Sequence, residues 1–211
     1  MDLGAPPRRR GKEWRERVMS GIALVALAPV FLVCAALIKL EGLFDPDAKG
    51  PVFFIEQRVS RGRVIGLLKF RTLRASALAT LDLDKPTHIR KLEKKGGLTR
   101  VGGAIRQWYL DELPQLINVL RGEMGLIGTR PWPLNLYEAE LTKGITRKRD
   151  MPAGLVGPVQ ARKGDKDAPP QLELDMAYWE AYRTYPGWKL LLLDLRILLR
   201  SGKVQLEHKG L

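Results

Sequence analysis

Apolar residues are distributed unevenly along this chain, and the longest uncharged run lies near the N-terminus. Residues 22–38 read IALVALAPVFLVCAALI, with Pro29 near the centre. A straight helix over this run would rise about 25 Å, slightly less than the roughly 30 Å of a bilayer's hydrocarbon core. With residues 18–21 included, the segment could just span. The pattern therefore predicts a membrane helix over residues 18–40.

The charges on both sides of the run favour a helix that enters the membrane and returns to the same face. Residues 1–17 carry six bases and three acids, and the chain beyond the run carries 30 bases and 20 acids. Because positive flanks prefer the cytoplasmic side, a simple span would misplace one of them. Pro29 disrupts the helix, so we expect a bend there, with Ser20 or neighbouring helices as partners for the freed carbonyls. A tilted span with a tolerated proline is the alternative.

Beyond the run, the pattern changes to short strands. Gly50-Pro51 introduces the apolar residues 52–55, and a turn around Arg61-Gly62 introduces residues 64–68. Two apolar runs separated by a glycine-containing turn predict a short β-hairpin. The polar stretch 75–95 is expected to be a loop with some helix.

Helices are predicted in the second half of the chain. Leucine and isoleucine recur at helical spacing over residues 111–120, and Gly122 ends this helix. Two further helices are expected over residues 135–143 and 171–184, the second ended by Pro186-Gly187.

The segment from Trp188 to Arg200 is leucine-rich but too charged to span a membrane. Its polar face carries Lys189, Arg196 and Arg200, and its apolar face carries Leu191, Leu192, Leu195, Leu198 and Leu199. This arrangement is typical of a helix lying flat on a membrane surface. A helix packed on the protein core would have a similar pattern, so both interpretations remain open.

Together these elements predict an α+β protein in three parts. They are a basic flank over residues 1–17, a re-entrant membrane helix over residues 18–40 and a cytosol-facing domain over residues 41–211. The domain is expected to be small and mostly helical, with a short β-hairpin and amphipathic helices at the membrane interface.

Composition narrows the possible partners. The 211 residues include 36 Lys and Arg against 23 Asp and Glu, a net charge of +13. This excess indicates a polyanionic partner, which could be nucleic acid, an anionic bilayer or a phosphorylated substrate. Cys34 is the only cysteine, so neither a disulfide framework nor a thiolate metal cluster is expected. His88 and His208 lack metal-ligand spacing and are expected on the surface.

Candidate chemistry is found in the stretch YLDELPQL at 109–116. Proline is tolerated in a first helical turn, so Pro114 predicts a helix that starts at Asp111 with this residue as its N-cap. The free amides there would keep Asp111 ionised and could bind phosphate. Of two adjacent carboxylates, one could attack while the other holds a divalent cation. A plain capping aspartate beside an exposed glutamate is the simpler alternative.

Several stretches together resemble the monotopic phosphoglycosyl transferases, a family of bacterial sugar transferases. In chain order they are GPVFFIEQRV at 50–59, KFRTL at 69–73, LTRVG at 98–102, LDELPQLINVLRGEM at 110–124, GTRP at 128–131, GLVG at 154–157 with Gln160, and LDMAY at 174–178. Three positions depart from the usual pattern. Tyr109 replaces a small Ser or Thr, Thr129 replaces a proline, and the segment 151–157 lacks the usual arginine.

The resemblance implies transfer of a sugar 1-phosphate from a UDP-sugar to undecaprenyl (polyprenol) phosphate, with release of UMP. It implies a re-entrant helix broken near a proline and an active site at the cytoplasmic face of the bacterial inner membrane, where glycan synthesis begins. A homodimer is possible, and no nucleic-acid partner is expected.

The resemblance also assigns roles to individual residues. Asp111 would be the nucleophile that forms a covalent phosphosugar intermediate, and Glu112, with Asp111, would hold Mg²⁺. The remaining candidates for substrate and phosphate binding are Lys69, Arg71, Arg130, Pro131 and Gln160.

Two alternatives to this mechanism and function remain open. Polyprenol phosphate could attack the donor directly, with both acids serving only as Mg²⁺ ligands. Alternatively, the chain could be a non-catalytic, membrane-attached basic protein that binds nucleic acid or anionic lipid, although it carries no RNP, zinc-finger or helix-turn-helix signature.

Overall fold

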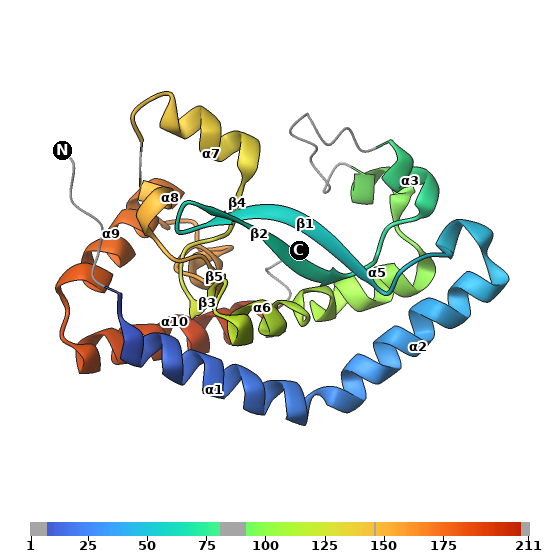
Figure 1. Cartoon of the computed structure of the whole chain (residues 1–211), viewed down its shortest axis with the longest axis horizontal. Coiled ribbons are helices and arrows are strands. Elements are labelled where there is room, and N and C mark those ends of the chain that lie inside the picture. The colour runs from blue at the N-terminus through green and yellow to red at the C-terminus, as the bar shows by residue number, and fades with distance from the viewer. Residues whose placement is uncertain (1–7, 81–91, 146, 208–211) are drawn as a thin grey trace.

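The computed structural model describes residues 8–80, 92–145 and 147–207, and His88 and His208 lie outside them. The chain combines many helices with two small sheets, which confirms the α+β prediction (Figure 1). The helices are α1 (Arg10–Ala26), α2 (Ala28–Phe44), α3 (Ala75–Ala79), α5 (Arg100–Gln107), α6 (Gln115–Arg121), α7 (Leu134–Leu141), α8 (Arg147–Asp150), α9 (Gln171–Thr184) and α10 (Gly187–Leu206). The strands are β1 (Phe53–Ser60), β2 (Arg63–Phe70), β3 (Gly125–Ile127), β4 (Trp132–Pro133) and β5 (Gly154–Val156).

Helices α1 and α2 form a wide V beneath the rest of the chain, bent by 61° at Leu27 (Figure 1). The bend near Pro29 was predicted, although helix extends well beyond residues 18–40. Pro29 lies in the first turn of α2, where its missing N–H leaves no hydrogen bond unmade. Among the described helices, none is long and apolar enough to cross a membrane alone, whereas this bent pair meets the length and composition test together.

Ser20 has a different role from the one predicted. Its side chain is buried, and Oγ donates a hydrogen bond of 2.7 Å to the carbonyl of Leu116 in α6, not to a carbonyl freed at the bend. This hydrogen bond fixes α1 against α6, which lies between the V and the hairpin (Figure 1).

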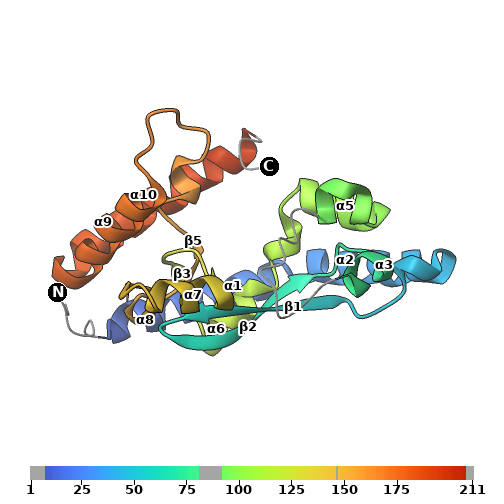
Figure 2. The same cartoon turned by 90° about the horizontal axis from the view of Figure 1, so that it is seen from above.

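The hairpin was predicted, with strands longer than the apolar runs indicated. β1 and β2 pair antiparallel from Phe53 opposite Phe70 to Ser60 opposite Arg63, around the turn at Arg61 and Gly62. β4 joins β1 as a third strand, while β3 and β5 form a separate parallel pair. Seen from above, α9 and α10 project to one side of this assembly (Figure 2).

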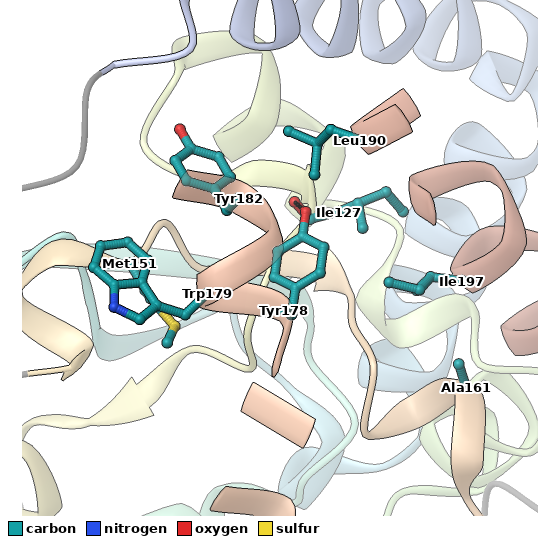
Figure 3. Close-up of a cluster of buried hydrophobic side chains, with 8 residues drawn as sticks. All are labelled: Ile127, Met151, Ala161, Tyr178, Trp179, Tyr182, Leu190 and Ile197. Atoms are coloured by element: carbon teal, nitrogen blue, oxygen red, sulfur yellow. Dashed lines mark hydrogen bonds between the residues drawn. The ribbon is translucent and has the colours of Figure 1, made fainter. Parts of the chain in front are cut away.

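The main core lies where α9 and α10 cover β3 (Figure 3). It comprises Ile127, Met151, Ala161, Tyr178, Trp179, Tyr182, Leu190 and Ile197. α9 has the predicted bounds, and α7 lies within two residues of its prediction.

Helix α10 packs on the protein core, as one interpretation of its sequence predicted, and leaves a leucine-rich face exposed. Leu190, Asp194, Ile197 and Ser201 are buried against the protein. The opposite face exposes Trp188, Leu191, Leu192, Leu195 and Leu199, while Leu198 packs at the edge of the core. An amphipathic helix can therefore complete the core and still present a leucine surface to the outside.

A buried charged network links α1 to α10. Lys12 Nζ lies 2.6 Å from both Glu16 Oε1 and Asp194 Oδ2. The second oxygen of Asp194 accepts a hydrogen bond of 2.8 Å from the Tyr178 hydroxyl, and Glu16 accepts one of 3.0 Å from the amide of Ile127. We call these five residues the paired network.

Candidate active site

The Asp111-Glu112 pair lies in a tight turn that precedes α6. Residues Leu110–Glu112 form a 3₁₀ turn, and α6 begins only at Gln115 after Pro114. The amide of Leu113 bonds to the carbonyl of Leu110 at 3.1 Å, and the amide of Ile117 bonds to that of Pro114 at 3.0 Å. These i→i+3 hydrogen bonds replace the expected first α-helical turn, so the prediction that Asp111 is the N-cap of this helix is wrong.

Tyr109 sets the direction of this turn. Its backbone is left-handed, with φ 57° and ψ 19°, a conformation that bulky residues rarely adopt. The residue sits between the end of α5 and the 3₁₀ turn, so the chain reverses sharply just before Asp111. Strain of this kind costs about 1 kcal/mol or more and is concentrated at functional sites.

Asn118 fixes the turn relative to the hairpin. This fully buried side chain accepts a hydrogen bond of 3.0 Å from the amide of Leu68 and donates one of 2.8 Å to the carbonyl of Gly66. Both partners lie on β2, the edge strand of its sheet. The amide side chain thus continues the ladder of β2 and holds α6 beside the strand that carries Lys69.

A narrow pocket results, lined by Lys69, Arg71, Glu93 and Asp111 among others. The structure thus brings the predicted nucleophile together with two of the predicted phosphate-binding residues. Lys69 Nζ lies 3.1 Å from Glu56 Oε2 on the neighbouring strand, and Glu56 also pairs with Arg58. The lysine is consequently held in place by β1 before any substrate binds.

Burial, and next to it the charge of Glu112, raise the pKa of Asp111 to about 7. Lys69 and Arg106 oppose this increase. We had expected an N-cap position to keep Asp111 ionised, and the structure overturns this because the turn supplies no capping amides and the carboxyl is desolvated. Near neutral pH the carboxyl is divided between its acid and its carboxylate.

Arg106 and Glu93 belong to the site but were not predicted. Arg106 Nη1 lies 2.5 Å from Glu93 Oε2, and both charges act on Asp111. Arg106 comes from α5, where the glycine pair obscures the helical pattern. One local signal was present, because Thr99 caps α5 by accepting a hydrogen bond of 2.9 Å from the amide of Gly102.

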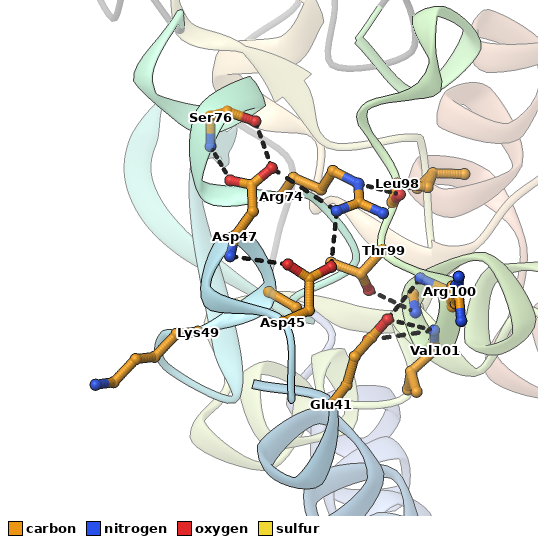
Figure 4. Close-up of polar contacts among 12 residues, drawn as sticks. Glu41, Asp45, Asp47, Lys49, Arg74, Ser76, Leu98, Thr99, Arg100 and Val101 are labelled. Atoms are coloured by element: carbon orange, nitrogen blue, oxygen red, sulfur yellow. Dashed lines mark hydrogen bonds and ion pairs between the residues drawn. The ribbon is translucent and has the colours of Figure 1, made fainter. Parts of the chain in front are cut away.

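The position of α5 depends on a cluster of polar contacts at the end of α2 (Figure 4). Glu41 accepts a hydrogen bond of 2.7 Å from the amide of Arg100 at the start of α5. Asp45 pairs with Arg74 at 2.8 Å, and Asp47 accepts two hydrogen bonds from Ser76. The loop before α5 is thereby tied to α2.

Arg71 lines the pocket, but its guanidinium donates hydrogen bonds to the loop after α2. The residue is 3% exposed. Its Nη1 donates a hydrogen bond of 3.0 Å to the carbonyl of Lys49, and its Nη2 donates one to the carbonyl of Ala48. Burial lowers the pKa of this guanidinium, while Glu41 and Asp47 oppose that change. In this conformation Arg71 holds the chain after α2 beside β2.

Arg130, Pro131 and Gln160 lie in a second group. Arg130 and Pro131 lead into β4, which pairs with β1 at Arg58 and Val59. Gln160 lies beside Gly157, which approaches the backbone of Gly128 so closely that a side chain there would clash. Lys69 of β2, by contrast, lies opposite Phe54 of β1 in the hairpin register. The two groups are therefore offset along β1 by roughly 13 to 17 Å.

The atypical segment at 151–157 has a structural role. Met151 and Ala153 are each 2% exposed, and residues Gly154–Val156 form β5 beside β3. The amide of Gly154 bonds to the carbonyl of Thr129 at 2.8 Å. Two of the three departures from the family pattern, Thr129 and the segment 151–157, are thus packed against each other.

The carboxylates at the pocket suit a metal shared with substrate. Within residues 8–80, 92–145 and 147–207, no group of three or more His, Cys, Asp or Glu side chains could hold a metal by itself. Mg²⁺ commonly uses only one or two carboxylates and takes its other oxygens from substrate phosphates. Asp111 and Glu112, which repel each other, fit such a site.

The sequence of this chain is similar to those of several known proteins. The UDP-glucose:undecaprenyl-phosphate glucose-1-phosphate transferase of Caulobacter vibrioides is 33% identical over 209 residues, which is 94% of this chain and 72% of that protein. The exopolysaccharide production protein PSS of Rhizobium leguminosarum is 33% identical over 186 residues, 83% of this chain and 85% of that protein.

Longer relatives match this chain over less than half of their own length. The galactosyl transferase CpsE of Streptococcus agalactiae is 31% identical over 188 residues, and the match covers 85% of this chain but 39% of that protein. The sequence model of the bacterial sugar transferases matches residues 8–208. This chain therefore belongs to the bacterial sugar transferase family.

Proposed function

We propose that the protein transfers a sugar 1-phosphate from a UDP-sugar to undecaprenyl phosphate, releases UMP and so initiates synthesis of a cell-surface polysaccharide. Membership of the family and the names of the Caulobacter and Komagataeibacter xylinus relatives support this reaction. The observation that carries the proposal is a half-buried carboxyl, Asp111, whose pKa of about 7 results from burial beside a second acid and opposite two cations.

The proposed chemistry proceeds in two displacements at phosphorus. A carboxylate oxygen of Asp111 attacks the phosphorus that bears the sugar, and the bond from that phosphorus to the bridging oxygen breaks, so UMP leaves with the electron pair. A phosphate oxygen of the lipid then attacks the same phosphorus, and the carboxylate of Asp111 is regenerated. No net proton transfer is required in either displacement.

The residues around Asp111 supply the charge that these displacements need. Lys69 and Arg106 favour the carboxylate form of Asp111 and attract the phosphates of both substrates. Mg²⁺, held by Glu112 and Asp111 together with the diphosphate, supplies further neutralisation when bound. Arg130 and Gln160 lie far enough from Asp111 to contact another part of the nucleotide sugar.

We further infer that α1 and α2 form a re-entrant pair at the cytoplasmic face of the inner membrane. The 61° bend and the many exposed apolar side chains of both helices support this topology. Cysteines introduced by Gly11→Cys and Lys49→Cys should react with an impermeant maleimide from the same side of sealed vesicles. Reaction from opposite sides would show a tilted span instead.

The reaction is tested with the full chain in nanodiscs that contain undecaprenyl phosphate, Mg²⁺ and a panel of UDP-sugars. We expect UMP and a lipid-linked sugar with at least one donor, and loss of both with Asp111→Asn. Asp167→Asn is the matched control, because Asp167 is an exposed acid outside the pocket. Absence of product with every donor would contradict the proposal, and would favour a non-catalytic basic membrane protein.

A further inference from the structure

A cationic pocket of about 660 Å³ lies at the turn end of the β1–β2 hairpin. It is bounded by β2, by the C-terminal end of α6, by α8 and by Arg8, which precedes α1. Five arginines line it together with the acids Glu123 and Asp150. Even with Glu13 included, which pairs with one of these arginines, the positive charges exceed the negative ones by two. A pocket of this size and charge suits a small polyanion.

Three of the five arginines are available to a ligand. Arg8, Arg63 and Arg121 have exposed side chains, and across residues 8–80, 92–145 and 147–207 no carboxylate pairs with them. Arg61 and Arg149 differ, because each contacts an acid, at 2.6 Å and 3.3 Å respectively. Arginine binds phosphate more readily than other anions of this size, since its planar group of N–H donors matches two phosphate oxygens at once.

The edge of β2 adds backbone donors to these arginines. Only β1 pairs with β2, and the amide of Leu68 points outward to Asn118. Because alternate residues of an edge strand direct their N–H groups away from the neighbouring strand, Val64 and Gly66 face outward as Leu68 does. Both residues line the pocket, and among the described residues neither amide has an acceptor. Two free amides thus lie beside the unpaired guanidinium groups.

The turn at this end of the hairpin is held in place before any ligand binds. Arg61 is left-handed, with φ 50°, which is uncommon for a residue with a side chain. Its amide bonds to the carbonyl of Met151 at 3.1 Å, and its guanidinium contacts Glu13 and, at 3.3 Å, the hydroxyl of Tyr182. Donors that are already ordered bind a ligand at a lower entropic cost.

The pocket is separate from the candidate active site. Lys69, which lines the site of Asp111, follows Arg63 by six residues along β2, a distance of about 20 Å at roughly 3.3 Å per residue. The two phosphorus atoms of a UDP-sugar are joined through one oxygen, so a donor that reacts at Asp111 places neither phosphate here. A ligand of this pocket is therefore a second phosphorylated molecule.

We propose that this pocket binds a phosphate-bearing ligand with two or more negative charges. Arg63, Arg121 and the amides of Val64 and Gly66 are its donors. A soluble diphosphate and the phosphate of a lipid head group share this chemistry, and Arg8 brings the pocket next to the start of α1. The assignment does not depend on the proposed transfer reaction.

Amide NMR of the full ¹⁵N-labelled chain in neutral detergent tests the site with inorganic pyrophosphate as the probe. We expect saturable shifts of the Val64 and Gly66 signals, and no such shifts with sodium chloride at the same ionic strength. Arg63→Gln and Arg121→Gln should each raise the apparent Kd by about tenfold. Arg196→Gln is the matched control, because Arg196 is an exposed arginine of α10 outside the pocket, and its Kd should equal that of the wild type.

Nanodiscs distinguish the two sources of phosphate. The wild-type chain is compared in phosphatidylcholine nanodiscs with and without phosphatidic acid. Shifts of Val64 and Gly66 caused by phosphatidic acid alone would assign the pocket to a lipid head group. Shifts caused by pyrophosphate but not by phosphatidic acid would assign it to a soluble ligand, and either result supports a phosphate site.

The contrary outcomes are equally specific. If neither probe produces saturable shifts at Val64 and Gly66, or if the two pocket variants bind pyrophosphate as tightly as Arg196→Gln does, the assignment is overturned. The arginines would then only protect an exposed strand edge from pairing with another chain. Neither arginine lines the site of Asp111, so UMP release by both variants should match the wild type. If no donor gives product, the NMR shifts still decide the question.

Discussion

Two clusters of charge, the paired network at α1 and the candidate active site beside α5, are constructed differently. In the paired network at α1, Lys12 contacts two carboxylates, the tyrosine hydroxyl donates to the other oxygen of Asp194, and a backbone amide donates to the Glu16 oxygen that Lys12 contacts. At the candidate active site, Asp111 and Glu112 are adjacent acids, and the nearest cations are shared with Glu56 and Glu93.

The difference distinguishes structural charges from reactive ones. Lys12, Glu16 and Asp194 are at most 7% exposed, yet each has a partner of opposite charge within 2.6 Å. Such groups hold elements together, and removing one leaves an uncompensated charge. Asp111 has the raised pKa of a carboxyl that is desolvated without full compensation, which is typical of functional sites.

Breaking the paired network should have the largest effect on stability. Asp194→Leu removes the hydrogen bonds that Lys12 and Tyr178 donate to a buried carboxylate, each worth about 1.5 to 3 kcal/mol, so we expect unfolding to become easier by about 3 to 5 kcal/mol. Thermal or denaturant unfolding in detergent measures this loss. The double variant Lys12→Met with Asp194→Leu leaves Glu16 buried without its cation, so it should be less stable still, and a double variant as stable as the single one would contradict the charge explanation.

Removing the carboxylate at the active site should stabilise the folded protein, whereas breaking the paired network should destabilise it. The folded pKa of Asp111 is about 7 against a usual 3.8, so the folded state binds the extra proton and stability falls as pH rises from about 4 to about 7. Asp111→Asn removes this cost. We expect a gain of about 2 kcal/mol at pH 8, equivalent to about 4 to 8 °C, and little gain at pH 4.

The stability gained by Asp111→Asn should therefore increase with pH and level off above about pH 7. Melting temperatures measured at several pH values test this. Asp167→Asn should change little at any pH. A stability loss in Asp111→Asn at pH 8 would mean that the carboxylate is compensated in the folded state.

Replacing the neighbouring acid should change the titration of Asp111 modestly. Burial is the larger cause of the raised pKa and the charge of Glu112 the second, so Glu112→Gln should lower that pKa by about one unit or less. Titration of ¹³C-labelled aspartate by NMR follows it directly. A return to the ordinary value near 4 would show that charge repulsion, not burial, controls this carboxyl.

The smallest effect is expected from a neutral contact of the same α1 helix. Ser20→Ala removes the buried hydrogen bond from Oγ to the carbonyl of Leu116, at a cost of about 1 to 2 kcal/mol. Denaturant unfolding measures this loss of stability. Ser76→Ala, which removes an exposed hydroxyl contact, is the control variant and should lose less. If Ser20→Ala destabilised the protein as much as Asp194→Leu, the buried charged contacts would contribute no more to stability than this neutral hydrogen bond.

Sequence reasoning succeeded where local signals are sufficient. The helix at 171–184 lies between Pro170 and Pro186-Gly187 and has the predicted bounds. The hairpin register follows from its turn. Asp111, Glu112 and Lys69 were predicted through motifs that resemble the family; the structure places them near one another, and their roles stay predictions.

The remainder depends on contacts between distant residues. The 3₁₀ turn before Pro114 depends on the left-handed backbone of Tyr109, which no local pattern indicates. Helix α5 contains two adjacent glycines and is anchored by Glu41 from α2. Arg106 could be recognised as part of the site only once that helix was placed beside the turn.

The most direct test of Asp111 as the nucleophile is to incubate the protein with a UDP-sugar that it accepts and Mg²⁺, in the absence of lipid acceptor. We predict up to one equivalent of UMP and a mass increase of one phosphosugar, mapped by peptide analysis to Asp111 and absent in Asp111→Asn. If UMP and the adduct appear only when undecaprenyl phosphate is added, the lipid attacks the donor directly and the covalent account is contradicted.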